Sequence, residues 1–238
     1  MTTTSTSSAG RRFVRALYRL LWRLWRPLGF RDNNRLRVQT LNGVGIIVLP
    51  GVFDGIRLRT GAFLADTINV ETCPQGARVL DLGTGSGLGA IFAARHGGRV
   101  IATDINPEAV RCAHLNALAH HLEGSIETRV GDLFEPVRGK SFDLVLFGPP
   151  YYHGAPRDLS DCAWRSRDAF ERFLEELPAY LSPEGRALVV LSTDGDIAGA
   201  LSSVAHLRVR AVRERELGNE KLTVYELRAA TAGARDIR

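Results

Sequence analysis

The sequence predicts an α/β fold built on a mostly parallel sheet, and two observations predict it. Short apolar segments alternate with amphipathic segments of helical spacing through most of the 238 residues. This alternation is typical of a parallel sheet with helices on both faces. The last two apolar segments, 207–214 and 221–228, are joined by a short turn instead of a helix, so we expect an antiparallel hairpin at one sheet edge.

The first part of the chain differs from the rest. Residues 1–10 are rich in Ser and Thr without an apolar pattern, and we expect a disordered tail. Residues 11–31 predict a basic amphipathic helix, with Leu and Phe on one face and Arg on the other. Arginine recurs every three or four residues, so this helix is not expected to span a bilayer. Packing against the body, contact with an anionic membrane surface and a targeting role remain open.

The next segment, 32–76, is predicted to lead into the sheet as a hairpin and a helix. Asn42-Gly43 separates two alternating stretches, which is a strong hairpin signal, and 63–70 has helical spacing. The main domain and a flexible tail are then expected at 77–230 and 231–238.

The main domain is predicted to hold five parallel strands and three helices in addition to the edge hairpin. The strand candidates are apolar and bounded by turn residues: 78–82, 99–103, 125–130, 142–147 and 187–191. The helix candidates carry apolar residues at helical spacing: 87–96, 107–120 and 168–181. The sheet would therefore have seven strands.

Charge and cysteine content bound the class of protein. Residues 1–35 hold eight arginines and one acid, so the net charge of +5 comes from this segment and the remainder is slightly acidic. That balance disfavours a nucleic-acid track across the body. The three cysteines lie far apart and no Cys/His spacing suits a metal, so we expect no metal site and a reducing, cytoplasmic setting.

A glycine-rich turn follows the first strand of the main domain. It reads Asp81-Leu82-Gly83-Thr84-Gly85-Ser86-Gly87. Glycines permit the tight turn and let a ligand approach the backbone, while the following helix offers free N–H groups. Two more acids, Asp104 and Asp132, follow the second and third strands. Because parallel strands end at the same sheet edge, we expect the three carboxylates to gather there.

A rigid loop follows the fourth strand. It reads Gly148-Pro149-Pro150-Tyr151, in which two prolines fix φ and remove two backbone donors. The polar and aromatic stretch 151–167 comes next and is expected to cover a substrate.

Together these motifs resemble the class I S-adenosylmethionine (SAM) methyltransferases. They most resemble the branch that methylates planar nitrogens through an Asn/Asp-Pro-Pro-Tyr loop, which includes the release-factor glutamine methyltransferases. The resemblance implies a Rossmann-like seven-stranded sheet and SAM as the cofactor. The cofactor-binding residues that it implies are Thr60, Asp81, Gly83, Thr84, Gly85, Gly87, Asp104, Ile105, Asp132 and Leu133.

Each implied cofactor residue has a role in the resembling family. Asp81 would accept from the charged amino-acid end of SAM, and Asp104 would hold the ribose hydroxyls. Ile105 would flank the adenine, whose amine would donate to Asp132. Thr60 belongs to a segment that would close over the methionine part.

The resemblance also implies an acceptor site at the proline loop. Its residues are Gly148, Pro149, Pro150, Tyr151 and His153. Gly148 replaces the family's Asn or Asp and has no side-chain acceptor, but the carbonyls of Gly148 and Pro149 still accept hydrogen bonds. Tyr151 would stack on a planar group. His153 is a candidate general base because imidazole exchanges protons near neutral pH.

We therefore expect a SAM-dependent methyltransferase that acts on a nitrogen of a protein side chain or small molecule, with nucleic acid less favoured. An NAD-dependent oxidoreductase is an alternative, since the glycine turn also satisfies the dinucleotide fingerprint, but Asp81 and the proline loop disfavour it. The other alternative is a SAM-binding module that has lost activity, with Gly148 as the trace of that loss. The oligomeric state is left open.

Overall fold

The computed structural model describes residues 35–217 and 220–230. The predicted tail 1–10, the predicted basic helix 11–31 and the tail 231–238 lie outside the described residues. Among the described residues, no helix has the length and apolar character needed to cross a bilayer.

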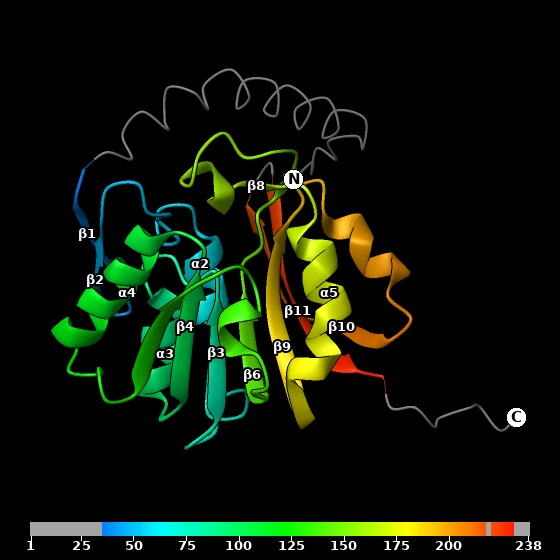
Figure 1. Ribbon diagram of the computed structural model, residues 1–238, viewed down its shortest axis with the longest axis horizontal. Coiled ribbons are helices and arrows are strands. Elements are labelled where there is room, and N and C mark those ends of the chain that lie inside the picture. The colour runs from blue at the N-terminus through cyan, green and yellow to red at the C-terminus, as the bar shows by residue number, and fades with distance from the viewer. Residues whose placement is uncertain (1–34, 218–219, 231–238) are drawn as a thin grey trace, which may run out of the picture.

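A seven-stranded sheet forms the centre of the described part (Figure 1). Its strands are β3 (Arg78–Leu82), β4 (Arg99–Asp104), β5 (Ile126–Val130), β6 (Phe142–Phe147), β9 (Leu181–Ser192), β10 (Leu207–Leu217) and β11 (Glu220–Ala229). The order is β10-β11-β9-β6-β3-β4-β5. The neighbouring strands β9, β6, β3, β4 and β5 pair in parallel, and β11 pairs antiparallel with both β9 and β10. The predicted mostly parallel sheet with an antiparallel edge pair is confirmed.

Four α-helices lie in the described part. They are α2 (Thr60–Ala65), α3 (Leu88–Arg95), α4 (Pro107–Ala119) and α5 (Ala169–Tyr180). Short 3-10 turns occur at η1 (Glu135–Val137), η2 (Asp161–Ala163) and η3 (Ala198–Ser203). The α4 helix starts where the sequence predicted, because the Asn106 side chain accepts from the Glu108 N–H and Pro107 suits the first helical position.

Two of the predicted elements differ most from the prediction. The helix expected at 63–70 forms earlier, as α2, and ends at Ala65. The Asn69 side-chain oxygen accepts from the N–H groups of Glu71 and Thr72, so a local turn replaces the expected last helical turn. Strand β9 is longer than the expected 187–191, since β6 and β11 provide partners along its two edges.

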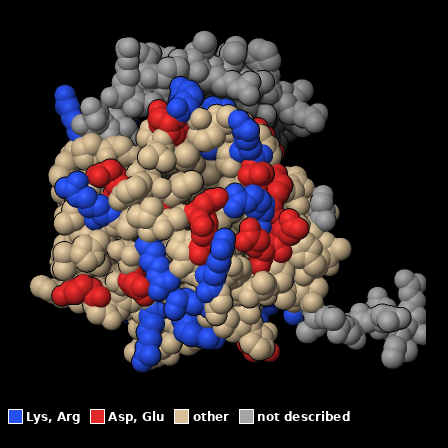
Figure 2. Space-filling model, in the orientation of Figure 1, with Lys and Arg blue, Asp and Glu red and all other residues tan. Residues whose placement is uncertain are grey.

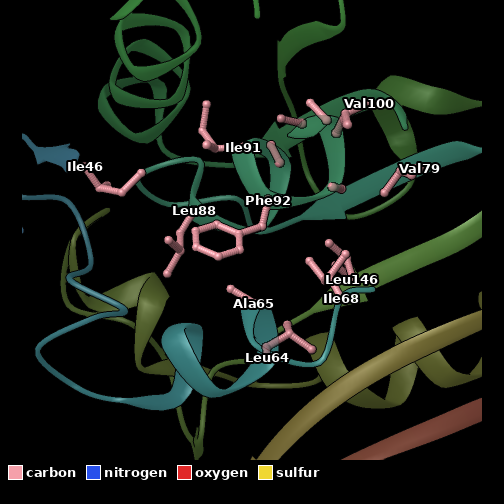
Figure 3. Close-up of a cluster of buried hydrophobic side chains, with 14 of the residues drawn as sticks. Ile46, Leu64, Ala65, Ile68, Val79, Leu88, Ile91, Phe92, Val100 and Leu146 are labelled. Atoms are coloured by element: carbon pink, nitrogen blue, oxygen red, sulfur yellow. The ribbon is translucent and has the colours of Figure 1, made fainter. Parts of the chain in front are cut away.

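The sheet buries apolar side chains on both faces. One core lies between the sheet, the hairpin and helices α2, α3 and α4, and Figure 3 shows Ile46, Ile91 and Phe92 within it. The other core lies under α5, where Phe173 has ring contacts with Phe134 and Phe147 at centroid distances of 5.8 and 4.5 Å. Helices on both faces are therefore confirmed.

Several hydrogen bonds hold the N-terminal hairpin against α4, among them those of one buried amide. Strands β1 (Arg37–Leu41) and β2 (Val44–Val48) turn at Asn42-Gly43, whose φ angles of 49° and 79° suit a two-residue hairpin. The Asn116 side chain of α4 accepts from the Ile47 N–H at 2.8 Å and donates to the carbonyls of Ile47 and Ser86 at 2.7 and 2.8 Å. Asn116 thus joins the hairpin, α4 and the glycine turn.

The segment between β6 and α5 crosses the carboxyl end of the parallel strands (Figure 1). It contains two short strands, β7 (Tyr152–His153) and β8 (Arg165–Ser166), which pair in parallel. This segment and the ends of β3, β4, β5 and β6 enclose the space described next.

Candidate functional site

A cavity of about 320 Å³ lies at the carboxyl ends of β3, β4, β5 and β6. Small-molecule sites typically measure about 300–1,000 Å³. Eight of the sequence-predicted site residues line it: Gly83, Gly85, Asp104, Ile105, Asp132, Leu133, Gly148 and Pro150. The opposite wall comes from the 156–169 stretch and Arg172 of α5. The cavity is the size and shape of a small-molecule site. We name it the main cavity.

Asp104 closes the glycine turn from the tip of β4. Its two carboxylate oxygens accept from the N–H groups of Gly85 and Asn106, at 3.0 and 2.9 Å. Burial raises the pKa of Asp104, while these backbone hydrogen bonds oppose the rise. The backbone of Ile105 also hydrogen-bonds to this carboxylate, so three of its four lone-pair directions are used. The carboxylate can therefore fix the turn and still accept from a ligand hydroxyl in the main cavity.

Asp81 lies behind the glycine turn and is almost completely buried. Its Oδ2 atom accepts from the Thr84 hydroxyl at 2.6 Å and from the Ala90 N–H at 2.9 Å. Burial raises the pKa of Asp81 to about 7, against the lowering effect of these two bonds. Gly87 precedes α3 with φ of 82° and no capping side chain, so Asp81 also serves as the acceptor for the start of that helix.

A second cavity, of about 70 Å³, extends from the main cavity past Gly83 and Gly85 to Asp81. Thr60, Thr84 and Tyr151 also line it. We name it the inner cavity. The predicted acceptor loop and the residues predicted to hold the amino-acid end of the cofactor therefore line the same cavity.

Tyr151 does not point into the main cavity. Its side chain is buried, with a hydrogen bond to Thr60, and burial raises the pKa of its phenol well above the ordinary value. A Cβ atom placed on Gly148 would lie 3.6 Å from Val190 Cγ1 and 4.0 Å from the Tyr151 hydroxyl. These are ordinary contact distances, so position 148 has space for the first atom of a side chain beside that hydroxyl.

Asp132 is paired with a residue that the sequence analysis did not single out. Arg172 of α5 donates to Asp132 Oδ2 at 2.8 Å, and Arg172 lies 40 positions away in the chain. Leu133, next to Asp132, has φ of 44°, an uncommon left-handed conformation for a residue other than glycine. A ligand amine at Asp132 would share the carboxylate with Arg172.

His153 and Pro149 line neither the main nor the inner cavity. The His153 Nε2 atom lies 3.5 Å from Glu171 Oε1, and the backbone N–H of His153 donates to Asp196 Oδ1 at 3.0 Å. The imidazole is half exposed. Its role as a general base stays a prediction, and the geometry gives it no contact with either cavity.

Two residues that the sequence analysis missed also bear on the site. Thr103 is buried and lines the main cavity, and its hydroxyl has no hydrogen-bond partner among the described residues. A buried hydroxyl without a hydrogen-bond partner costs stability. Phe53 lines both cavities from the loop after β2. Neither position carries a motif signal, since only tertiary packing brings them to the glycine turn.

Comparison with protein families assigns the chain to a known group. The family model described as "Methyltransferase small domain" matches residues 43–216, which run from the hairpin turn through the glycine turn into β10. The chain belongs to the methyltransferase small domain family. The resemblance stated from the sequence motifs is thereby confirmed.

Curated relatives in this family carry two kinds of name. The chain is 31% identical over 157 residues to ribosomal RNA small subunit methyltransferase C of Alcanivorax borkumensis, covering 62% of this chain and 45% of the relative. It is 30% identical over 216 residues to the release factor glutamine methyltransferase of Cereibacter sphaeroides, covering 79% and 75%. The chain spans about half the length of several curated relatives it matches.

Solved structures of methyltransferases share the fold. A methyltransferase from Pyrococcus furiosus aligns with a TM-score of 0.58 at 18% identity, covering 92% of this chain and 98% of its own. The Thermus thermophilus 16S rRNA N2 G1207 methyltransferase, solved with AdoMet (SAM) and guanosine, aligns with a TM-score of 0.59 at 21% identity, covering 81% and 50%. These likenesses confirm the predicted Rossmann-like sheet.

Proposed function

We propose that the chain is a SAM-dependent methyltransferase that transfers a methyl group to a nitrogen of a protein side chain or small molecule. The observation that carries this proposal is the connection between two cavities. The main cavity joins the glycine turn to Asp104, and the inner cavity joins Asp81 to Gly148 and Tyr151. Family membership and the motif order support the same function.

The residues present fit SAM chemically. Asp81 offers a buried carboxylate to a cationic amino group, and Asp104 offers a free lone pair to a ribose hydroxyl. The exposed side of Ile105 suits an adenine face. Bound SAM would supply an electrophilic methyl group. The backbone carbonyls of the 148–150 loop would orient the acceptor nitrogen, so most of the rate gain would come from alignment.

Charge on the body favours a protein or small-molecule acceptor over RNA. On the face shown in Figure 2, acidic and basic side chains mix at the upper right, whereas basic side chains gather at the lower centre, away from the 151–167 segment at the upper end of the sheet. The residues after position 35 carry a slight net negative charge. Nucleic-acid binding surfaces are usually basic along the path of the phosphates. The ribosomal RNA enzymes among the relatives keep an RNA acceptor as the second candidate.

Binding of SAM against NADH to the full-length protein tests the proposal. Isothermal titration calorimetry should detect binding of SAM and no binding of NADH. Gly85→Val should abolish SAM binding, because Gly85 has φ of 56° and donates to Asp104. Gly139→Val is the matched control, since Gly139 also has a positive φ, of 75°, but lies in open space away from both cavities.

The outcomes separate the alternatives. Binding of NADH in preference to SAM would favour the oxidoreductase. Tight SAM binding without transfer to any acceptor in a protein and small-molecule extract would favour a degenerate module, and Gly148→Asn would then test whether the missing side chain explains it. Equal SAM affinity in Gly85→Val and Gly139→Val would refute the placement of the cofactor.

A further inference from the structure

A third cavity, of about 60 Å³, adjoins the inner cavity on the Tyr151 side. The two share Phe53, Thr60 and Tyr151 as walls. The remaining walls are Leu58, Tyr152, Trp164, Ser192, Asp194, Gly195 and Glu220. We name this space the acidic aromatic cavity. It admits a group of a few heavy atoms and has no part in holding the cofactor as proposed above.

Aromatic rings form much of its lining. Phe53 and Trp164 meet edge to face, with centroids 4.9 Å apart, and Tyr151 and Tyr152 add two phenol rings. Trp164 comes from the 151–167 segment, so this segment supplies a wall here as well as one in the main cavity. The faces of such rings are electron-rich and attract cations.

Two carboxylates complete the lining. Asp194 accepts from the Tyr152 hydroxyl at 3.1 Å, and Glu220 accepts from the Ser192 hydroxyl at 3.1 Å. Both donors are neutral, so neither bond cancels the negative charge. Burial raises the pKa of Glu220 and the charge of Asp194 adds to the rise, while Arg59 acts in the opposite direction. Because the Arg59 side chain is exposed, solvent screens it, and the cavity keeps a negative balance.

We propose that the acidic aromatic cavity selects a methyl acceptor that carries a cationic nitrogen group, an aliphatic amine or a guanidinium, held by Asp194 and Glu220 between the aromatic walls. This inference rests on the proposed function, because it makes the cavity the acceptor side of the same site. A neutral amide, as in a glutamine side chain, would leave both carboxylates without a cationic partner.

In the proposed transfer, Glu220 accepts the proton that the acceptor nitrogen must lose. The cationic nitrogen first loses one proton to the Glu220 carboxylate, which frees a lone pair. That lone pair forms the new N–CH₃ bond while the S–CH₃ bond breaks and its electron pair stays on sulfur. The sulfonium charge is thereby lost and the methylated nitrogen becomes the cation. Glu220 then returns its proton to solvent.

The test uses the full-length protein with labelled SAM and three probes of similar size: Nα-acetyl-lysine, Nα-acetyl-arginine and Nα-acetyl-glutamine methylamides. We expect at least tenfold faster labelling of the lysine or arginine probe than of the glutamine probe, and comparison of the two cationic probes identifies which group is the acceptor. Glu220→Gln and Asp194→Asn should each reduce that preference at least tenfold. Glu123→Gln, an exposed acid that lines none of the three cavities, is the control.

Affinity for the product S-adenosylhomocysteine, measured on each variant, separates the two proposals. We expect it to stay within twofold of wild type in Glu220→Gln and Asp194→Asn, which also shows that both are folded. The inference would be overturned by equal labelling of the probes, by no labelling, by a preference for the glutamine probe, or by a preference that survives both substitutions. If product binding is intact in these cases, the cofactor site is not contradicted. If the wild-type protein does not bind S-adenosylhomocysteine, the proposed function itself is contradicted.

Discussion

The buried Asp81 carboxyl makes cofactor affinity depend on pH. Its pKa is raised to about 7, chiefly by burial. If the amino-acid end of SAM binds the ionised carboxylate, the protein must release the Asp81 proton before it binds. Affinity should then be nearly constant above pH 7 and fall about tenfold for each pH unit below it. Between pH 8 and pH 6 the dissociation constant should rise about tenfold, or about 1.4 kcal/mol in binding free energy.

The assay is calorimetric titration of the full-length protein with S-adenosylhomocysteine at pH 6, 7 and 8. Asp81→Asn is the matched variant, because the amide keeps an oxygen that can accept from Thr84 and Ala90. Its affinity should be weaker and nearly independent of pH. Burial raises the pKa of Asp104 as well. Asp81→Asn keeps Asp104, so any pH dependence that remains in this variant can be ascribed to Asp104. A flat wild-type profile, or a full tenfold change that persists in Asp81→Asn, would refute the reasoning.

The same shift has a consequence for folding without cofactor. Asp81 binds its proton more tightly in the folded state than in the unfolded state, where its pKa is about 4. Between pH 4 and pH 7 the folded state therefore holds more protons, so its stability should rise as pH falls through this window. The three-unit shift corresponds to an upper bound of about 4 kcal/mol. Urea unfolding of wild type and Asp81→Asn at pH 5 and pH 7 measures it, and identical pH slopes would count against a raised Asp81 pKa.

Three further predictions concern the residues around the site. Asn116→Ala should lower the free energy of unfolding by about 2–4 kcal/mol, because the Ile47 N–H and the Ser86 carbonyl lose this partner, whereas the Ile47 carbonyl keeps the Cys112 thiol; a loss below 0.5 kcal/mol in urea titration would show that these groups find water. Gly87→Ala should cost about 2–4 kcal/mol, since φ is 82° and the new Cβ would lie 2.9 Å from Ala113 Cα, whereas Gly124→Ala, in open space, should be nearly neutral. Thr103→Val should leave the free energy of unfolding unchanged or raise it by about 1 kcal/mol, because the buried hydroxyl has no hydrogen-bond partner among the described residues; a destabilised variant in urea titration would mean that the hydroxyl already has a partner.

The order of elements could be read from the sequence because it depends on local patterns. Four strand and helix starts agree with the prediction, at Arg78, Arg99, Phe142 and Pro107. Each lies where apolar spacing changes or where a capping residue stands, and such signals involve neighbours in the chain. The end of α2 was wrong, because Asn69 competes for backbone donors through its side chain.

The composition of the candidate site was only partly predictable. The glycine turn, Asp104 and the proline loop carry short motifs, and the structure brings Gly83, Asp104 and Gly148 to one cavity wall. Arg172 and Phe53 carry none, and their positions depend on how α5 and the loop after β2 pack over the sheet end.

The sequence by itself determined the sheet, the motif order and the family, since these follow from periodicity and from residue types at fixed spacing. Tertiary structure decided which way the functional side chains face. It turned Tyr151 into the protein, paired Asp132 with Arg172, left His153 outside both cofactor-side cavities and placed Asp194 beside Glu220. These contacts join residues that are distant in the chain, as for Thr60 with Tyr151 and for Tyr152 with Asp194, which is 42 positions away. These contacts form only when separate helices, strands and loops pack together, so local sequence patterns do not predict them.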